Sequence, residues 1–94
     1  MEPLQLLAPD GTLTGDVPDG LDEDRLVGMM RLMLLGRRLD QKAIALQRRG
    51  KLGTYAPLSG QEAASVGSSF AMDPDVDHLV PQYREQLAML HWGL

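Results

Sequence analysis

The longest regular pattern of apolar positions in the chain begins at Leu26 and continues through Leu46. Asp22 precedes this pattern and is a preferred helix N-cap, and two further acids follow it where they complement the helix dipole. The pattern ends in an Arg-Arg-Gly tripeptide at 48–50, which is a basic last turn followed by a glycine suited to the C′ position. The sequence therefore predicts a long helix over residues 23–49.

Two glycines, Gly28 and Gly36, interrupt this predicted helix. Each costs about 1 kcal/mol relative to alanine, so packing must support the helix or a second element must approach it closely. The neighbouring charged residues Arg37, Arg38 and Asp40 are interpreted as a more polar side of the helix.

Two short apolar runs, each followed by a Pro-Asp-Gly turn, precede the long helix. This arrangement predicts a small hairpin or an extended leader over residues 1–21. The leader and the first residues of the long helix are also acidic, because residues 1–24 hold seven of the 13 acids and none of the nine bases. The net charge of −4 thus derives from these first 24 residues, and the rest of the chain has the charge to face an anion.

The pattern after the long helix predicts two further helices with a short strand between them. Ser59 and Glu62 form the S-x-x-E pattern of a capping box, in which Glu62 reaches back to the Ser59 backbone at the start of the second helix. The acidic turn DPDVD ends that helix, and the apolar run HLVP at 78–81 is consistent with a strand. Residues 82–93 predict a third helix that Gly93 terminates.

The composition argues against several classes of site and location. Without cysteine there are no disulfides or thiolate ligands, and a reducing cytoplasm is the expected location. The N-terminus carries the early glutamate Glu2 and lacks a basic n-region, so no signal peptide is expected. The most apolar stretch, MMRLMLLG, is broken by Arg31 and is far shorter than the roughly 20 residues that cross a bilayer, so no membrane span is expected. The two histidines lack a partner at metal-ligand spacing, and no glycine-rich phosphate motif occurs. The acidic balance disfavours nucleic acid.

One tripeptide, Gln82-Tyr83-Arg84, remains a candidate for anion binding. It lies where a short apolar run meets the predicted third helix, and backbone N–H groups and the helix dipole favour a phosphate at such a junction. Arginine adds two parallel donors and tyrosine adds one more. The alternative is an ordinary helix start with a solvated arginine.

Taken together, the motifs LQRRGKLGTYAP, GQEA, VGS and YRE resemble the α subunit of the thiamin-diphosphate-dependent E1 component of 2-oxoacid dehydrogenase complexes. The direct match runs over residues 37–85, about half of the chain. The resemblance implies an α/β thiamin-diphosphate-binding fold for the full-length family, of which this chain is the mostly helical N-terminal part. Residues 1–21 are then an acidic extended leader, and residues 22–94 are the N-terminal helical part of an incomplete thiamin-diphosphate-binding domain.

The resemblance also implies cofactor contacts for four residues. Tyr83 and Arg84 match a dipeptide that lies against thiamin diphosphate with its arginine on the diphosphate, and Gln82 is expected to share that contact. Thr54 matches a position near the thiazolium and the substrate that is often aromatic in relatives, so threonine is a departure that affects substrate packing. Residues 54–58 are expected to line one wall of the pocket.

No catalytic or metal-ligating residue is expected in this chain. In the family, Mg²⁺ bridges the diphosphate to a Gly-Asp-Gly…Asn motif. The chain has no asparagine and no Gly-Asp-Gly, so this metal site is expected to lie outside it.

The implied activity is the oxidative decarboxylation of pyruvate with acyl transfer to a lipoyl carrier. The implied partners are an E1 β subunit, a second α subunit, the E2 lipoyl acyltransferase and the 2-oxoacid substrate, with no nucleic acid and no membrane. The isolated chain is expected to be an inactive partial subunit. Two alternatives stay open. One is a branched-chain 2-oxoacid dehydrogenase E1 α subunit, and the other is a non-catalytic helical interaction module that binds a partner through its Met and Leu face.

Overall fold

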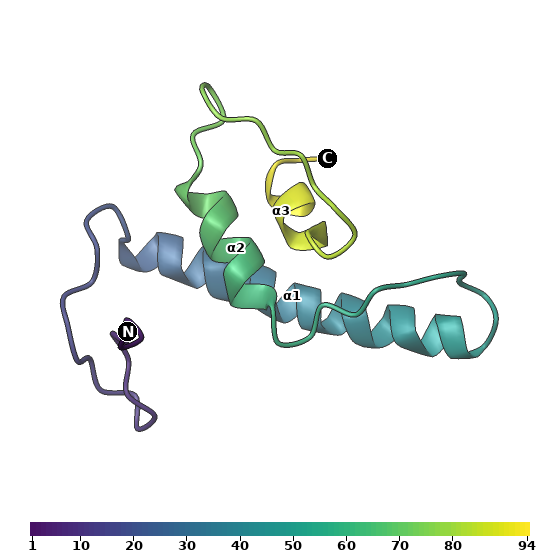
Figure 1. Cartoon of the computed structure of the whole chain (residues 1–94), viewed down its shortest axis with the longest axis horizontal. Coiled ribbons are helices and arrows are strands. Elements are labelled where there is room, and N and C mark those ends of the chain that lie inside the picture. The colour runs from purple at the N-terminus through teal and green to yellow at the C-terminus, as the bar shows by residue number, and fades with distance from the viewer.

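The computed structural model describes residues 1–94 as three helices and a leader, with no β-sheet (Figure 1). Helix α1 spans Glu23–Arg48, α2 spans Glu62–Ala71 and α3 spans Gln86–His91. Helices α2 and α3 pack against each other, and both contact α1. None of these helices combines the length and the apolar character that crossing a membrane requires.

Helix α1 confirms the predicted long helix to within one residue at its end. The Asp22 carboxylate accepts a hydrogen bond from the Arg25 backbone N–H at 2.8 Å, so Asp22 is the N-cap. At the other end Gly50 has a φ of 70°, and the N–H groups of Gly50 and Lys51 donate to carbonyls three and five residues earlier. These two bonds form a Schellman motif, which ends the helix.

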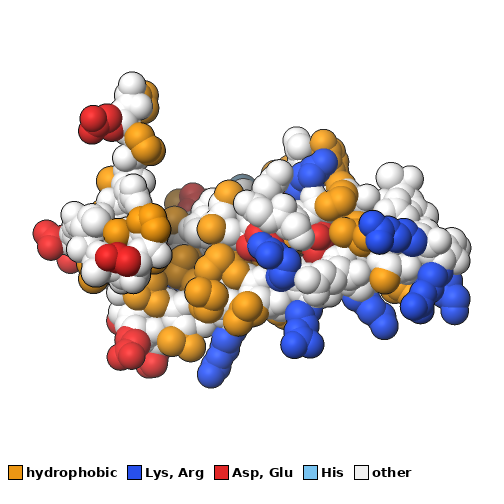
Figure 2. Space-filling model, turned by 90° about the horizontal axis from the view of Figure 1, so that it is seen from below, with side chains coloured by type: hydrophobic (Ala, Val, Ile, Leu, Met, Phe, Trp, Pro, Cys, Tyr) orange, Lys and Arg blue, Asp and Glu red, His pale blue; other side chains and the backbone are white.

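The leader forms the small hairpin that its turns predict. Leu7 and Leu13 make an isolated antiparallel bridge across the first Pro-Asp-Gly turn, and the Leu21 N–H donates to the Pro18 carbonyl across the second. Nearly all leader residues are exposed. Figure 2 shows acidic side chains at the leader end of the molecule and Lys and Arg side chains along the remainder of this face, so the charge asymmetry of the sequence becomes a separation in space.

The hydrophobic core is small and lies where the three helices meet. Leu58, Val66 and Leu87 form its centre, and each is at most 1% exposed. A Cβ atom at Gly36 would lie 2.5 Å from Leu87, so the missing side chain allows α3 to approach α1 closely. The partly buried hydrophobic residues that pack against this centre are Met29, Leu32, Met33 and Phe70.

Two local predictions for the C-terminal third are wrong. Residues 78–81 form no strand, because no neighbouring strand pairs with their backbone. The third helix begins at Gln86, four residues later than predicted. Residues 82–85 form a turn instead, in which the Glu85 carboxylate accepts the Gln82 N–H at 2.6 Å.

Candidate functional site

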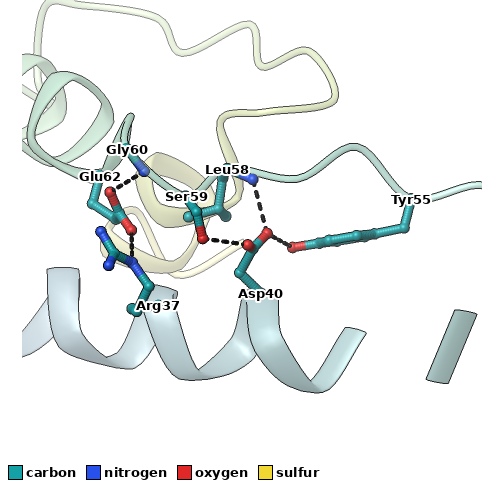
Figure 3. A network of polar contacts seen from close by, with 7 residues as sticks. All are labelled: Arg37, Asp40, Tyr55, Leu58, Ser59, Gly60 and Glu62. Carbon is teal, nitrogen blue, oxygen red and sulfur yellow. Dashed lines mark hydrogen bonds and ion pairs between the residues drawn. The ribbon is translucent and has the colours of Figure 1, made fainter. Parts of the chain in front are cut away.

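A buried carboxylate on α1 holds the loop that leads into α2 (Figure 3). Asp40 is completely buried. It accepts three hydrogen bonds, from the Tyr55 hydroxyl at 2.8 Å, the Leu58 N–H at 2.8 Å and the Ser59 hydroxyl at 2.6 Å. Donors of this kind replace the water that a carboxylate loses on burial. The α1–α2 loop, residues 49–61, is thereby attached to α1 at three points.

Burial and these hydrogen bonds shift the pKa values of Asp40 and Tyr55. Burial alone would raise the pKa of the Asp40 carboxyl, but the hydrogen bonds from Ser59, Leu58 and Tyr55 hold this pKa below its ordinary value. Burial and the adjacent carboxylate raise the pKa of Tyr55 to about 12. At neutral pH the network is therefore an ionised carboxylate that faces three neutral donors.

Glu62 forms a second network beside the first (Figure 3). One of its carboxylate oxygens pairs with the Arg37 guanidinium, and the other accepts the Gly60 N–H at 2.8 Å. The Glu62 side chain is 7% exposed and that of Arg37 is 51% exposed. The hydrogen bond from Arg37 is the main reason that the pKa of Glu62 falls to about 2. This network joins α1 to the first turn of α2.

The interpretation of Asp40 as part of a more polar side of the helix is wrong, because Asp40 is completely buried. Asp40 lies on the inward face of α1 with Gly36 and Ala43, which precede and follow it by four and three residues. Arg38 is exposed as expected. The signal in the sequence for burial of Asp40 is its position between two small residues, Gly36 and Ala43, on one face of the helix.

The predicted capping box of α2 is also wrong. The Ser59 hydroxyl donates to Asp40 and caps nothing in α2, whose N-cap residue Gln61 makes no side-chain cap bond. Glu62 is the first residue of the helix, and its carboxylate reaches the Gly60 N–H rather than that of Ser59. The buried Asp40 acceptor therefore draws the serine away from the helix end.

The α1–α2 loop and the 82–85 turn are joined by Arg84, one of the four residues predicted to contact the cofactor. The Arg84 Nη1 atom donates to the Pro57 carbonyl at 2.6 Å. Thr54 lies exposed in the same loop, and Gln82 and Tyr83 are exposed in the turn. The two segments that the sequence marked separately therefore meet in space.

A hollow of about 240 Å³ lies between α2 and the 82–85 turn. Arg84 borders it together with Glu85, so a cation and a carboxylate both face this space. Gln82, Tyr83 and Thr54 do not line it, so the four predicted residues do not converge on one closed cavity. The remaining lining residues are Gln61, Ala64, Ser65 and Ser68.

The donor set of the 82–84 turn fits an anionic group. Guanidinium, phenol and amide side chains all offer N–H or O–H donors, and Arg84 uses only one of its N–H groups on Pro57. The helix dipole contributes little here, because α3 has only six residues and starts beyond this turn. No group of three or more His, Asp or Glu side chains is placed to hold a metal ion. The donor side chains of this turn therefore suit an anion by their chemistry.

Comparison with known proteins matches the part of the chain that contains these features. Residues 30–94 match the model of the family described as "Dehydrogenase E1 component". The chain belongs to this family. The matched residues include both carboxylate networks and the 82–85 turn, and the resemblance drawn from the sequence motifs is confirmed.

Named relatives within the E1 family are pyruvate dehydrogenase E1 component α subunits. The protein from Staphylococcus epidermidis strain RP62A is 40% identical over 99% of this chain and 25% of its own length. The protein from Staphylococcus aureus strain Mu50 is 39% identical with the same coverage. The chain therefore spans about a quarter of the length of the curated relatives it matches. No solved structure matches the chain.

Proposed function

We propose that this chain is the N-terminal segment of a pyruvate dehydrogenase E1 α subunit and that it forms one edge of a thiamin diphosphate site. The observation that carries the proposal is the 40% identity to a pyruvate dehydrogenase E1 α subunit over 99% of this chain. Residues 1–21 are then a leader, and residues 22–94 are the helical beginning of a larger α/β thiamin-diphosphate-binding fold.

The role of this segment is to bind and orient the charged tail of the cofactor. When bound, thiamin diphosphate supplies the electron sink for decarboxylation of the 2-oxoacid. Arg84 offers guanidinium N–H groups to the diphosphate, Tyr83 offers its hydroxyl and Gln82 its amide. Thr54 in the α1–α2 loop is the proposed contact near the reacting end. The metal that accompanies the diphosphate is assigned to residues outside this chain, which has no asparagine and no Gly-Asp-Gly.

The proposed substrate is pyruvate, and the proposed acceptor of the acyl group is the lipoyl carrier of an E2 acyltransferase. The names of the relatives favour pyruvate over a branched-chain 2-oxoacid. An E1 β subunit and a second α subunit are the proposed partners that complete the active site. The segment alone is proposed to bind without catalysing turnover, because the donors that it offers hold only part of the cofactor.

Calorimetric titration of the chain with thiamin diphosphate, pyrophosphate and thiamin tests this role. The first two ligands are expected to bind and thiamin is not, because the donors of the turn recognise the diphosphate. Arg84→Ala is expected to weaken thiamin diphosphate binding by about 2 kcal/mol, since a charged hydrogen-bond donor is lost. Arg38→Ala, which removes an exposed arginine of α1, is the matched control and should bind like wild type. Equal affinities of Arg84→Ala and wild type would refute the role of Arg84.

A helical interaction module is the second candidate function, and the outer face of α1 favours it. Val27, Leu34 and Leu35 are 44%, 60% and 55% exposed, although Met29 and Met33 pack against the core. An exposed apolar helix face suits a groove on a partner protein. Intact coding sequence downstream of residue 94 would exclude this candidate, and an in-frame stop together with absent diphosphate binding would favour it.

A further inference from the structure

Asp40 is linked to Arg84 through the α1–α2 loop, although the two residues come from opposite halves of the chain. Asp40 binds this loop on both sides of Pro57, at Tyr55 and at Leu58. The carbonyl of Pro57 in turn accepts the Arg84 Nη1 hydrogen at 2.6 Å. A buried carboxylate, a short stretch of backbone and a guanidinium thus form one continuous chain of hydrogen bonds.

The geometry of Pro57 and of the Arg84 guanidinium restricts the directions in which their polar groups can point. Proline has a fixed φ and no N–H, so the carbonyl is the only polar backbone group that Pro57 presents. Tyr55 and Leu58 are attached to Asp40, which restricts the direction in which that carbonyl points. A guanidinium is planar and rigid, so an anchor on one N–H restricts the directions of its other N–H groups.

We propose that Asp40 is a positioning residue that, through the Pro57 carbonyl, orients the Arg84 guanidinium toward an anionic group. The identity of that group as a diphosphate rests on the proposed function, whereas the orientation of Arg84 does not. Pre-orientation raises affinity because the arginine then loses less conformational freedom when the anion binds.

Three variants separate positioning from general loss of stability. Asp40→Ala removes the acceptor for all three loop donors. Asp40→Asn is the conservative rescue: its amide oxygen can still accept from Tyr55 and Leu58, and its NH₂ can donate to the Ser59 hydroxyl. Arg37→Ala is the matched control, because it breaks the adjacent ion pair between α1 and α2 and leaves the Asp40 contacts in place.

Two readouts on the 94-residue chain follow these variants. The first is the NMR signal of the Arg84 Nε–H group, which is sharp and dispersed only when the guanidinium is held. The second is the affinity for inorganic pyrophosphate by calorimetry. Asp40→Ala is expected to lose the Arg84 signal and about tenfold in pyrophosphate affinity. Asp40→Asn and Arg37→Ala are expected to keep both.

The proposal is overturned if folded Asp40→Ala retains the Arg84 signal, or if Arg37→Ala loses it equally. If Asp40→Ala does not fold, Asp40→Ser replaces it, because its shorter side chain does not reach the Leu58 N–H that shares a peptide bond with the Pro57 carbonyl, and a full Arg84 signal in folded Asp40→Ser likewise overturns the proposal. If wild type and Arg84→Ala do not differ in pyrophosphate binding, the proposed function fails. The Arg84 signal alone then decides the positioning role.

Discussion

Asp40 and Glu62 are carboxylates that the fold removes from water and keeps ionised. Three donors surround Asp40, whereas Glu62 has a guanidinium and a backbone N–H. Such donors lower the energy of the charged form and offset the cost of burial. The two residues hold different segments, because Asp40 attaches the α1–α2 loop to α1 and Glu62 attaches the start of α2 to α1.

The free energy of unfolding is expected to fall in acid through Glu62. The pKa of Glu62 is about 2 in the folded chain and 4.5 in its ordinary state, so its contribution is fully present above about pH 5 and is lost as the pH falls toward about 2. Glu62→Gln should remove about 2 kcal/mol of this pH dependence, with allowance for the half-exposed Arg37.

Urea unfolding of wild type and Glu62→Gln at neutral pH and at about pH 3 measures this contribution. The comparison between the two proteins is needed because the pKa of Asp40 is also lowered, so protonation of Asp40 in acid also reduces the free energy of unfolding. This loss occurs in both proteins, and the difference between them is due to Glu62. An identical loss of stability in both proteins would show that Glu62 is not the titrating group.

Helix α1 has two faces with different roles. Its buried residues are Gly36, Asp40 and Ala43, so the inward face combines small side chains with one carboxylate. Leu34 and Leu35 lie outward and exposed. The small residue Gly36 allows α3 to approach α1 closely, and the Asp40 carboxylate binds the α1–α2 loop.

Replacement of the two glycines of α1 by alanine is expected to have opposite effects. At Gly36 a Cβ atom would meet the buried Leu87 side chain at 2.5 Å, so Gly36→Ala should destabilise the chain by about 1 to 3 kcal/mol despite its better helix propensity. At Gly28 no atom lies within 4 Å of the added Cβ, so Gly28→Ala should stabilise by up to about 1 kcal/mol.

Chemical denaturation of both glycine variants gives this comparison directly. Leu87→Ala combined with Gly36→Ala should show a favourable coupling, because the smaller side chain relieves the contact. Stabilisation by Gly36→Ala would mean that α3 does not approach α1 as closely as the structure has it.

The whole molecule consists of a helical body with a small core and an acidic leader at one end (Figures 1 and 2). The hydrogen bonds of residues 1–17 are confined to the leader itself. Residues 18–21 differ, because they border a cavity of about 410 Å³ that Arg25 and Phe70 also line. The end of the leader therefore meets the body, and its beginning does not.

Deletion of residues 2–17 is expected to change the free energy of unfolding by less than about 0.5 kcal/mol, because it removes exposed residues that make no bond to the helices. Deletion of residues 2–21 is the comparison and should destabilise the body measurably. Thermal unfolding followed by circular dichroism checks both. A large loss from the shorter deletion would contradict the division of the chain into leader and body.

Much of the fold was predictable because its signals are local. The N-cap at Asp22 and the glycine stop at Gly50 involve residues within one turn of the helix end, and the Pro-Asp-Gly turns are equally local. The family was also recognisable from the order of short motifs. For the candidate site, the sequence selected Gln82, Tyr83 and Arg84 by chemistry, and their role toward a cofactor stays a prediction.

The errors fall where a residue depends on a partner far along the chain. The S-x-x-E pattern predicts that Ser59 caps α2, but the Ser59 hydroxyl donates instead to Asp40, which lies 19 residues earlier in the chain. Residues 78–81 have the composition of a strand but no paired neighbour.

The sequence by itself thus determined the long helix, its ends, the charge asymmetry and the family, since these need only neighbours in the chain or the order of motifs. The tertiary structure alone decided that Asp40 is buried and that Arg84 rests on Pro57, 27 residues away. The physical reason is that a buried polar group takes whichever donor the packing of the helices brings to it.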